Sequence, residues 1–273
     1  MAKASRGGTN NGGGGGIAAA AASAQAAAPA PQAAPAGPRN YGTFTDADAA
    51  ALRQLQDSAY NGSVTAAVKM YTSGQPNTPA ANIDGQGHSL SQSMNYFLEQ
   101  GVDLMKANAA QLNRQFGTSI TPRALASMQY AYQYMHAGAH AIGKDVVLTK
   151  GAHIDILSNQ FGIRNFRGMS EQQLSQKLVG ATFKNEAYVS TSYDAKRSPF
   201  LDKNSPISGG REVIYRIHAK SETKVLFGLK SQAEIIIDRG TSFKVTGVRF
   251  SGATATPRGK GTMPQIIIDL ETV

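Results

Sequence analysis

Three short segments of this 273-residue chain carry side chains that could act together on a small ligand. In chain order they are Arg167-Gly168, Ser190-Thr191-Ser192 and Gln232-Ala233-Glu234. An arginine can hold a phosphate or a carboxylate through two parallel hydrogen bonds, and a glycine beside it lets a ligand approach the backbone. Hydroxyls can donate to a carboxylate and fix its direction without neutralising it. Each segment alone also fits a solvated strand, so their order carries more information than any one of them.

The third segment stands at the mouth of an apolar run, Ile235-Ile236-Ile237. Residues i and i+2 of a strand point to the same face. If the strand already includes Gln232, then Gln232 and Glu234 look into one cleft, with Ile236 deeper on the same side. Ile235 and Ile237 then face the opposite side.

Composition excludes several classes of site. Hydrophobic residues make up 41% of the chain, enough for a sizeable core, and cysteine is absent, which excludes disulfide frameworks and cysteine-based zinc sites. His136 and His140 are four residues apart and can share a helix face, but no HExxH pattern accompanies them. We therefore predict no metal.

The net charge of +9 is unevenly distributed: +3 in residues 1–39, −1 in 40–143 and +7 in 144–273. A basic carboxy-terminal part suits an anionic ligand or partner. The basic residues are dispersed and no RNA-binding motif or zinc finger occurs, so we expect no nucleic-acid partner. No run of about 18 strongly apolar residues occurs, so we expect no membrane insertion.

The chain divides into three parts by composition and apolar patterning. Residues 1–40 are rich in Gly, Ala and Pro, which predicts a disordered tail. Residues 41–273 form the predicted domain, helical over 41–145 and β-rich over 146–273. Helices are expected to begin at Thr45 or Asp46, at Ser89 or Ser91, and at Thr121-Pro122. The apolar spacing of the second of these helices allows it to run on to Phe116.

The β-rich part has short, β-branched runs separated by Gly, Ser and Pro. It predicts strands at Ile163–Arg167, Ala187–Ser192, Glu212–Ala219, Lys224–Phe227, Glu234–Asp238, Ser242–Phe250 and Gln265–Leu270. Short helices are expected at Ile154–Phe161 and from Ser170 to Leu178. Few helices between strands favour an α+β fold with an antiparallel or mixed pair of sheets after a helical region. The absence of GxGxxG and Walker-type loops argues against Rossmann or P-loop binding.

The ordered set of Arg167, Ser190-Thr191-Ser192 and Gln232-x-Glu234 resembles the mono-ADP-ribosyltransferases of the arginine–serine–glutamate class. Residues 183–192 (FKNEAYVSTS) resemble a strand of the clostridial Rho-modifying exoenzymes and the actin-modifying binary toxins. Residues 210–217 (GREVIYRI) and 235–243 (IIIDRGTSF) resemble two later strands of these enzymes. The resemblance covers roughly 160–273 and implies the ADP-ribosyltransferase fold.

The resemblance implies NAD⁺ as co-substrate, cleaved at the nicotinamide–ribose bond through an oxocarbenium-like transition state. Glu234 matches the carboxylate that stabilises this cation, by the logic of glycoside hydrolysis. Arg167 matches the residue that pairs with the NAD⁺ phosphates, and Gly168 would present backbone groups to the nicotinamide amide. Ser190 matches the serine that orients the glutamate.

The remaining cofactor contacts are implied less directly. Thr191 and Ser192 belong to the same NAD⁺-binding strand and support its geometry. In the loop 193–211, Phe200 is the candidate for packing on the nicotinamide ring. Arg211, with Arg197 as second choice, would contact phosphate, although this loop departs from the family pattern in length.

Gln232 is relevant to which side chain of a target protein accepts ADP-ribose. In the families it resembles, Glu at this position accompanies arginine modification, and Gln accompanies other acceptors such as asparagine. A neutral amide cannot take a proton from a guanidinium, but it can pair with another amide. We therefore expect an Asn or Gln acceptor in a target protein, with Phe227 or Leu229 as a hydrophobic contact.

Two other functions stay open at this point. One is an NAD⁺ glycohydrolase that transfers ribose only to water, and the other is a non-catalytic binding or virion-associated protein on the same fold. We expect a monomer, with a host protein as partner. It would be a secreted or injected effector, or a phage protein, acting in a host cytoplasm.

Overall fold

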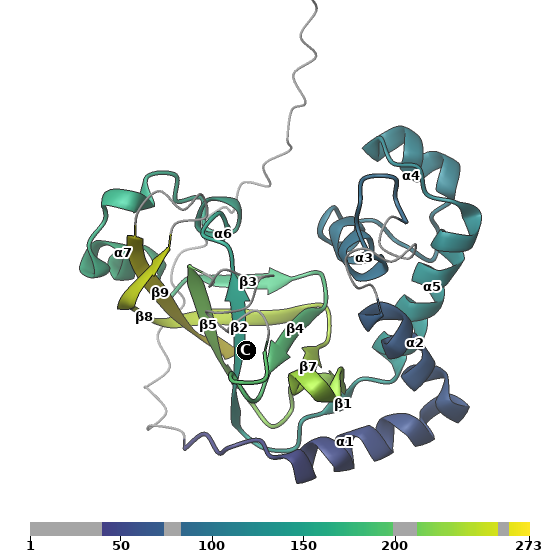
Figure 1. The fold of residues 1–273 in the computed structure, drawn as a ribbon, viewed down its shortest axis with the longest axis horizontal. Helices are drawn as coiled ribbons and strands as arrows, with labels where there is room; N and C mark the ends of the chain where they lie inside the picture. The colour runs from purple at the N-terminus through teal and green to yellow at the C-terminus, as the bar shows by residue number, and fades with distance from the viewer. Residues whose placement is uncertain (1–39, 74–82, 199–211, 256–261) are drawn as a thin grey trace, which may run out of the picture. The chain divides into compact units, whose positions relative to one another are not determined.

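The computed structural model describes residues 40–73, 83–198, 212–255 and 262–273, all within one unit, Asn40–Val273 (Figure 1). Apart from Asn40, the predicted tail 1–40 lies outside the described residues. The candidate residues Phe200 and Arg211 also lie outside them.

The region 41–145 is helical, as predicted. Its α-helices in the described residues are α1 (Asp46–Ser58), α2 (Ser63–Thr72), α3 (Leu90–Glu99), α4 (Ala109–Phe116) and α5 (Pro122–Ala137). A 3₁₀ turn, η1 (Ala59–Gly62), joins the first two. Thr45, Ser89 and Thr121 each accept a hydrogen bond from the backbone N–H three residues further on, which confirms the predicted helix starts.

Helix α3 is shorter than its apolar spacing allowed. It ends at Glu99, and Gly101 follows with a φ of 75°. Helix α4 is a separate element that begins after its own cap, Asn108. A glycine in the left-handed region is a common way to end a helix, because it costs no Cβ clash.

The carboxy-terminal part folds as a mixed sheet. Its strands are β1 (His140–Ala141), β2 (Val146–Ala152), β3 (Thr182–Asn185), β4 (Val189–Ser192), β5 (Val213–Ala219), β6 (Lys224–Phe227), β7 (Glu234–Ile237), β8 (Thr241–Ala255) and β9 (Thr262–Thr272). Helices α6 (Ile156–Asn159) and α7 (Glu171–Leu178), with the 3₁₀ turns η3 (Phe166–Gly168) and η4 (Lys230–Gln232), complete it. The predicted α+β class is confirmed.

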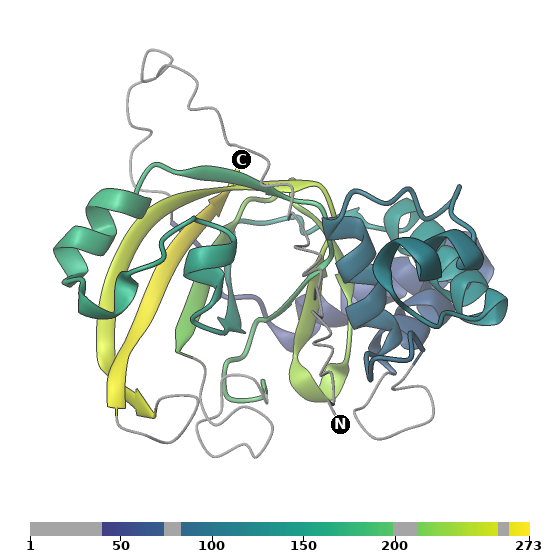
Figure 2. The same cartoon turned by 90° about the horizontal axis from the view of Figure 1, so that it is seen from above.

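The strands join in the order β1-β6-β7-β4-β2-β5-β9-β8-β3, and β5–β9 is the parallel pair of this order. The sequence predicted two sheets, but in the described residues the strands hydrogen-bond into one. The link between β4 and β2 is a single residue pair, Thr149↔Ser192. The sheet therefore has a seam at this point, where two groups of strands are joined by minimal pairing (Figures 1 and 2).

The predicted strand Ile163–Arg167 is wrong. Gly162 has a φ of 69°, and residues 166–168 form the turn η3. Ile163 and Phe166 both pack on the core, three residues apart. A spacing of three suits a helical turn, whereas a strand needs alternation.

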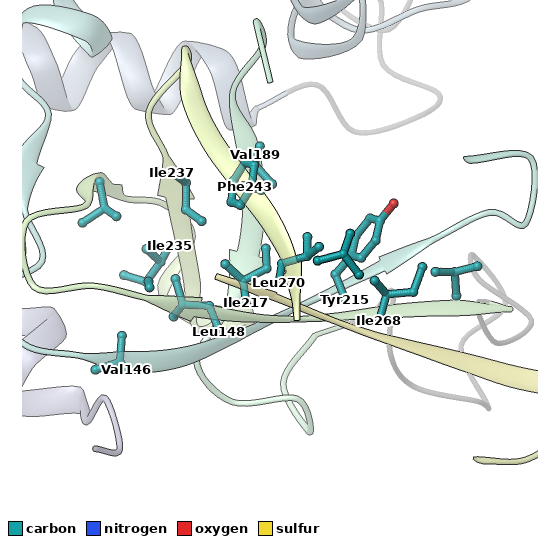
Figure 3. Close-up of a cluster of buried hydrophobic side chains, with 14 of the residues drawn as sticks. Val146, Leu148, Val189, Tyr215, Ile217, Ile235, Ile237, Phe243, Ile268 and Leu270 are labelled. Atoms are coloured by element: carbon teal, nitrogen blue, oxygen red, sulfur yellow. The ribbon is translucent and has the colours of Figure 1, made fainter. Parts of the chain in front are cut away.

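Two clusters of buried apolar side chains lie on the two faces of β7. Ile235 and Ile237 pack in the cluster that the labelled side chains of Figure 3 represent, together with Leu148 and Ile217. Ile236 packs in the other cluster, with the helices α2, α3 and α5. The opposite facing of Ile236 and its two neighbours was predicted and is confirmed.

Two amide side chains tie the helices to the strands. Gln56 on α1 is 3% exposed, donates to the Phe227 carbonyl at 3.2 Å and accepts from the Phe227 N–H at 2.9 Å. Asn95 on α3 does the same with Tyr188, accepting from its N–H and donating to its carbonyl, both at 3.2 Å. Helices α1 and α3 are thus bonded to the backbone just before η4 and just before β4.

Candidate active site

Glu234 lies at the first position of β7, opposite Ser192 on β4, and is 8% exposed. An isolated ionised carboxylate is costly to bury, so such a group requires donors or a nearby cation. The segment before Glu234 and the neighbouring strands supply both.

The loop 228–233 wraps around this carboxylate. The Leu229 N–H donates to Oε2 of Glu234 at 2.9 Å, and the Gly228 N–H donates to its backbone carbonyl at 3.0 Å. A Cβ at Gly228 would overlap the Glu234 carboxylate. Residue 228 must therefore be glycine for the carboxylate to lie where it does.

Gln232 does not share a strand face with Glu234. It belongs to η4, and Ala233 between the two has a φ of 49° and is fully buried. A left-handed alanine interrupts the alternation of a strand, so the prediction that i and i+2 look into one cleft is wrong here. Gln232 is half-buried, and its backbone carbonyl accepts from the Ser192 hydroxyl at 2.9 Å.

The three hydroxyls of β4 divide into two kinds. Thr191 and Ser192 are buried, and their hydroxyls donate to backbone carbonyls of Ile235, Gln232 and Asp194. They support the strand geometry, as predicted. Ser190 is half-buried, and its hydroxyl acts on the Glu234 carboxyl by lowering its pKa. Ser190 and Glu234 are thus brought together.

Burial raises the pKa of Glu234 above its ordinary value of 4.5. Three groups oppose this shift of the pKa: the Leu229 N–H, the Ser190 hydroxyl and the positive charge of Lys150. Lys150 lies on β2, directly after Thr149, which forms the single pair with β4. Desolvation also raises the pKa of Glu99 at the end of α3, and Lys150 again opposes the shift.

Lys150 is the residue that the sequence reasoning missed. No strand was predicted over 146–152, whereas β2 spans Val146–Ala152 and includes Lys150. The signal was present as Thr149-Lys150-Gly151, a basic residue followed by glycine near the end of a strand. This is the same pattern that drew attention to Arg167-Gly168.

Arg167 and Gly168 lie in η3, which packs on the core next to α7 rather than on a strand. In the part of the chain that the structure describes, no hydrogen bond or charge effect connects this turn with Glu234. The Arg167 side chain itself is outside the described residues. A Cβ at Gly168 would meet nothing within 4 Å, so no close packing requires glycine there.

The structure also bears on three other predicted residues. Phe227 is 5% exposed and belongs to the core, so the expectation that it contacts a target protein is wrong; Leu229 is half-buried and keeps that role as a prediction. Arg197 is paired with Asp46 at 2.6 Å and with Asp194 at 3.1 Å, which anchors it to α1.

A pocket of about 350 Å³ lies at the other end of β7, next to Asp238 and Arg239. It contains none of the predicted site residues. Within the described ranges, no group of three or more His, Asp or Glu side chains could hold a metal ion. Nor does any helix there have the length and apolar character to cross a membrane.

Comparisons with known proteins give one family match, over the carboxy-terminal part of the chain. Residues 139–273 match the family model described as ADP-ribosyltransferase exoenzyme. No curated protein matches the chain.

Among solved structures, the chain is similar to an ADP-ribosyltransferase from Clostridium botulinum (15% identity, 86% of this chain and 99% of that chain covered, TM-score 0.47). It is also similar to the C3 exoenzyme of Clostridium limosum (16%, 86% and 98%, 0.48) and to an S. aureus protein whose structure was solved with NAD (15%, 86% and 99%, 0.47). These values are too low to transfer single residues.

Residues 139–273, which contain the whole sheet and both Ser190 and Glu234, therefore form an ADP-ribosyltransferase exoenzyme domain. This match supports an NAD⁺–protein ADP-ribosyltransferase of the exoenzyme type. The resemblance predicted from the sequence is confirmed.

We predict that Gly228→Ala strongly reduces turnover while the protein remains folded. The added methyl group displaces the Glu234 carboxylate, and a misplacement of about 1 Å can cost about 100-fold in rate. Nicotinamide release from NAD⁺ measures the effect, with circular dichroism as a check on folding. Gly42→Ala is the matched control, because its Cβ would make an ordinary contact of 3.6 Å. Equal activities of the two variants would contradict the prediction.

Proposed function

We propose that this protein cleaves NAD⁺ at the nicotinamide–ribose bond and transfers ADP-ribose to an amide side chain of a target protein. The observation that carries the proposal is the buried Glu234 carboxylate, held by the Leu229 N–H and by Ser190 within the region that matches the exoenzymes. The action in a host cytoplasm and the identity of the target belong to the same proposal.

The chemistry follows from the charge that develops on the ribose. As the N-glycosidic bond breaks, nicotinamide leaves with the electron pair and becomes neutral, and the ribose becomes an oxocarbenium ion. A fixed carboxylate stabilises this cation more than it stabilises the ground state. The acceptor amide nitrogen then forms the new bond and loses a proton. Water in place of the amide gives simple hydrolysis.

The donor also carries a pyrophosphate, which requires a cation. Arg167 was the candidate from the sequence, and Lys150 is the candidate from the structure because its charge acts on Glu234. Lysine is a competent phosphate binder, although it lacks the planar fork of arginine. We favour Lys150 for this role, with Arg167 as the alternative.

The acceptor is proposed from Gln232, which stays on η4 two residues before Glu234. Its half-buried amide can donate to and accept from another amide, and it cannot deprotonate a guanidinium. Leu229 in the same loop is half-buried and is a candidate contact for the target surface.

We predict that Glu234→Gln lowers nicotinamide release by about 100- to 1,000-fold, the usual effect of removing a transition-state electrostatic contact. The binding of NAD⁺, followed by calorimetry, should change little because Gln keeps the shape of the side chain. Near-normal turnover of this variant would remove Glu234 from the catalytic role. Release without any labelled protein in a host lysate would favour a glycohydrolase over a transferase.

A second prediction distinguishes Lys150 from Arg167 as the residue that contacts the NAD⁺ phosphates. Lys150→Ala should raise the KM for NAD⁺ by about 10- to 100-fold, the loss of a hydrogen bond to a charged group, and Lys150→Arg should restore most of it. Arg167→Ala is the matched comparison and should leave KM close to that of the wild type. The reverse pattern would assign the phosphate contact to Arg167.

A third prediction concerns the acceptor. With labelled NAD⁺ and a host lysate, mass spectrometry should locate ADP-ribose on Asn or Gln of one target. Gln232→Glu should lose this modification while it still releases nicotinamide, because the carboxylate cannot donate to the acceptor amide. Unaltered labelling of the same site by this variant would exclude Gln232 from acceptor recognition.

A further inference from the structure

The buried face of helix α1 includes one polar side chain. The buried residues of this helix are Ala49, Leu52 and Gln56, and Gln56 is only 3% exposed. A buried amide is costly unless its donor and its acceptor both find partners. Both partners of Gln56 are backbone atoms of Phe227, at the end of β6.

Gln56 takes the place of a strand partner at the end of β6. In the part of the chain that the structure describes, β1 pairs with Lys224 and Val225 of β6 and does not reach Phe227. On its other side, Phe227 lies opposite Ile235 of β7. The Phe227 N–H and carbonyl, which no neighbouring strand takes up, bond to the Gln56 amide instead.

The orientation of the Gln56 amide is fixed by the backbone. The Phe227 N–H can only donate, so the Gln56 atom that faces it at 2.9 Å must be the oxygen Oε1. Nε2 therefore donates to the Phe227 carbonyl at 3.2 Å. A flipped amide would place two donors at one contact and two acceptors at the other.

One peptide group links this amide to Glu234. The Phe227 carbonyl and the Gly228 N–H belong to the same planar unit. Its carbonyl accepts from Gln56, and its N–H donates to the Glu234 backbone carbonyl at 3.0 Å. The next N–H, that of Leu229, donates to Oε2 of Glu234 at 2.9 Å, and the Glu234 N–H donates to the Leu229 carbonyl at 3.1 Å.

We propose that Gln56 is a positioning residue of the active site. Through the peptide group between Phe227 and Gly228 it fixes the loop whose N–H groups hold the Glu234 carboxylate. The link to turnover rests on the proposed role of Glu234. The proposal makes helix α1, which lies outside the region that matches the exoenzymes, a part of the catalytic unit.

The experiment uses Gln56→Met in the full chain. Methionine keeps the length of the side chain but removes both the donor and the acceptor. Gln129→Met is the matched control, because Gln129 on α5 also binds backbone through its amide. It donates to the carbonyls of Leu104 at 2.8 Å and Ala107 at 3.3 Å, which both lie in the helical part.

Amide hydrogen exchange of the ligand-free protein, followed by NMR, gives the first readout. In Gln56→Met the Leu229 amide should exchange about tenfold faster relative to the Ile217 amide of β5, because its bond to Glu234 opens more often. A general loss of stability would speed up both amides and leave their ratio unchanged. Gln129→Met should also leave this ratio unchanged.

Turnover supplies the second readout. Gln56→Met should lower kcat for nicotinamide release about tenfold, because a loosened loop misplaces the carboxylate. The KM for NAD⁺ should change little, since Gln56 acts on Glu234 and not on the donor. Gln129→Met should keep the kcat of the wild type.

A second variant, Gln56→Asn, guards against a Gln56→Met protein that does not fold. Asparagine is one methylene group shorter, so its amide no longer reaches both Phe227 atoms while it stays polar. It should show the same faster Leu229 exchange and the same loss of kcat at similar KM.

An unchanged Leu229 exchange ratio or an unchanged kcat in the folded Gln56 variants would overturn the proposal, and so would equal effects of Gln129→Met. A wild-type protein without nicotinamide release would instead contradict the proposed function. In that case, faster Leu229 exchange in the Gln56 variants would still establish that Gln56 holds the loop around Glu234.

Discussion

The burial of the Glu234 carboxylate at the start of β7 sets the conditions for everything around it. A carboxylate that is 8% exposed keeps its charge only if donors and a cation replace the lost water. The Leu229 N–H, the Ser190 hydroxyl and the charge of Lys150 are these replacements. The loop before the strand accordingly has a glycine where the carboxylate packs and a left-handed alanine where the chain must turn into β7. Local backbone strain at such a position is typical of functional sites.

The helical part contributes to the same site although it lies mostly outside the region that matches the exoenzymes. Gln56 holds the backbone of Phe227, just before the loop that surrounds Glu234. Asn95 holds the backbone of Tyr188, just before Ser190. Both are buried or half-buried amides that satisfy a backbone donor and a backbone acceptor at once, which fixes position more rigidly than apolar packing alone. The helices thus hold both segments that carry the candidate catalytic side chains.

Much of this arrangement was readable from the sequence. Helix caps such as Thr45 and Ser89 are local signals, and the alternating burial of Ile235, Ile236 and Ile237 follows from strand geometry. The nearness of Ser190 to Glu234 was available because both sit on strands with recognisable patterns. The left-handed conformation of Ala233 could not be predicted from the sequence, because alanine gives no sign of that conformation and only the tertiary contacts enforce it. Lys150 was missed because β2 was not among the predicted strands, and Arg167 was put on a strand because two apolar residues were taken for alternation.

The two-sided burial of β7 has a consequence for the folding unit. Ile236, Leu226 and Tyr188 are buried against the helices, so a fragment that began near residue 139 would expose them all to water. Helices and sheet are therefore expected to unfold in a single cooperative transition, because neither can keep its core without the other. The boundary of the evolutionary match and the boundary of the thermodynamic domain differ by about a hundred residues. Excision of the matched segment alone would yield an aggregating chain rather than a minimal enzyme.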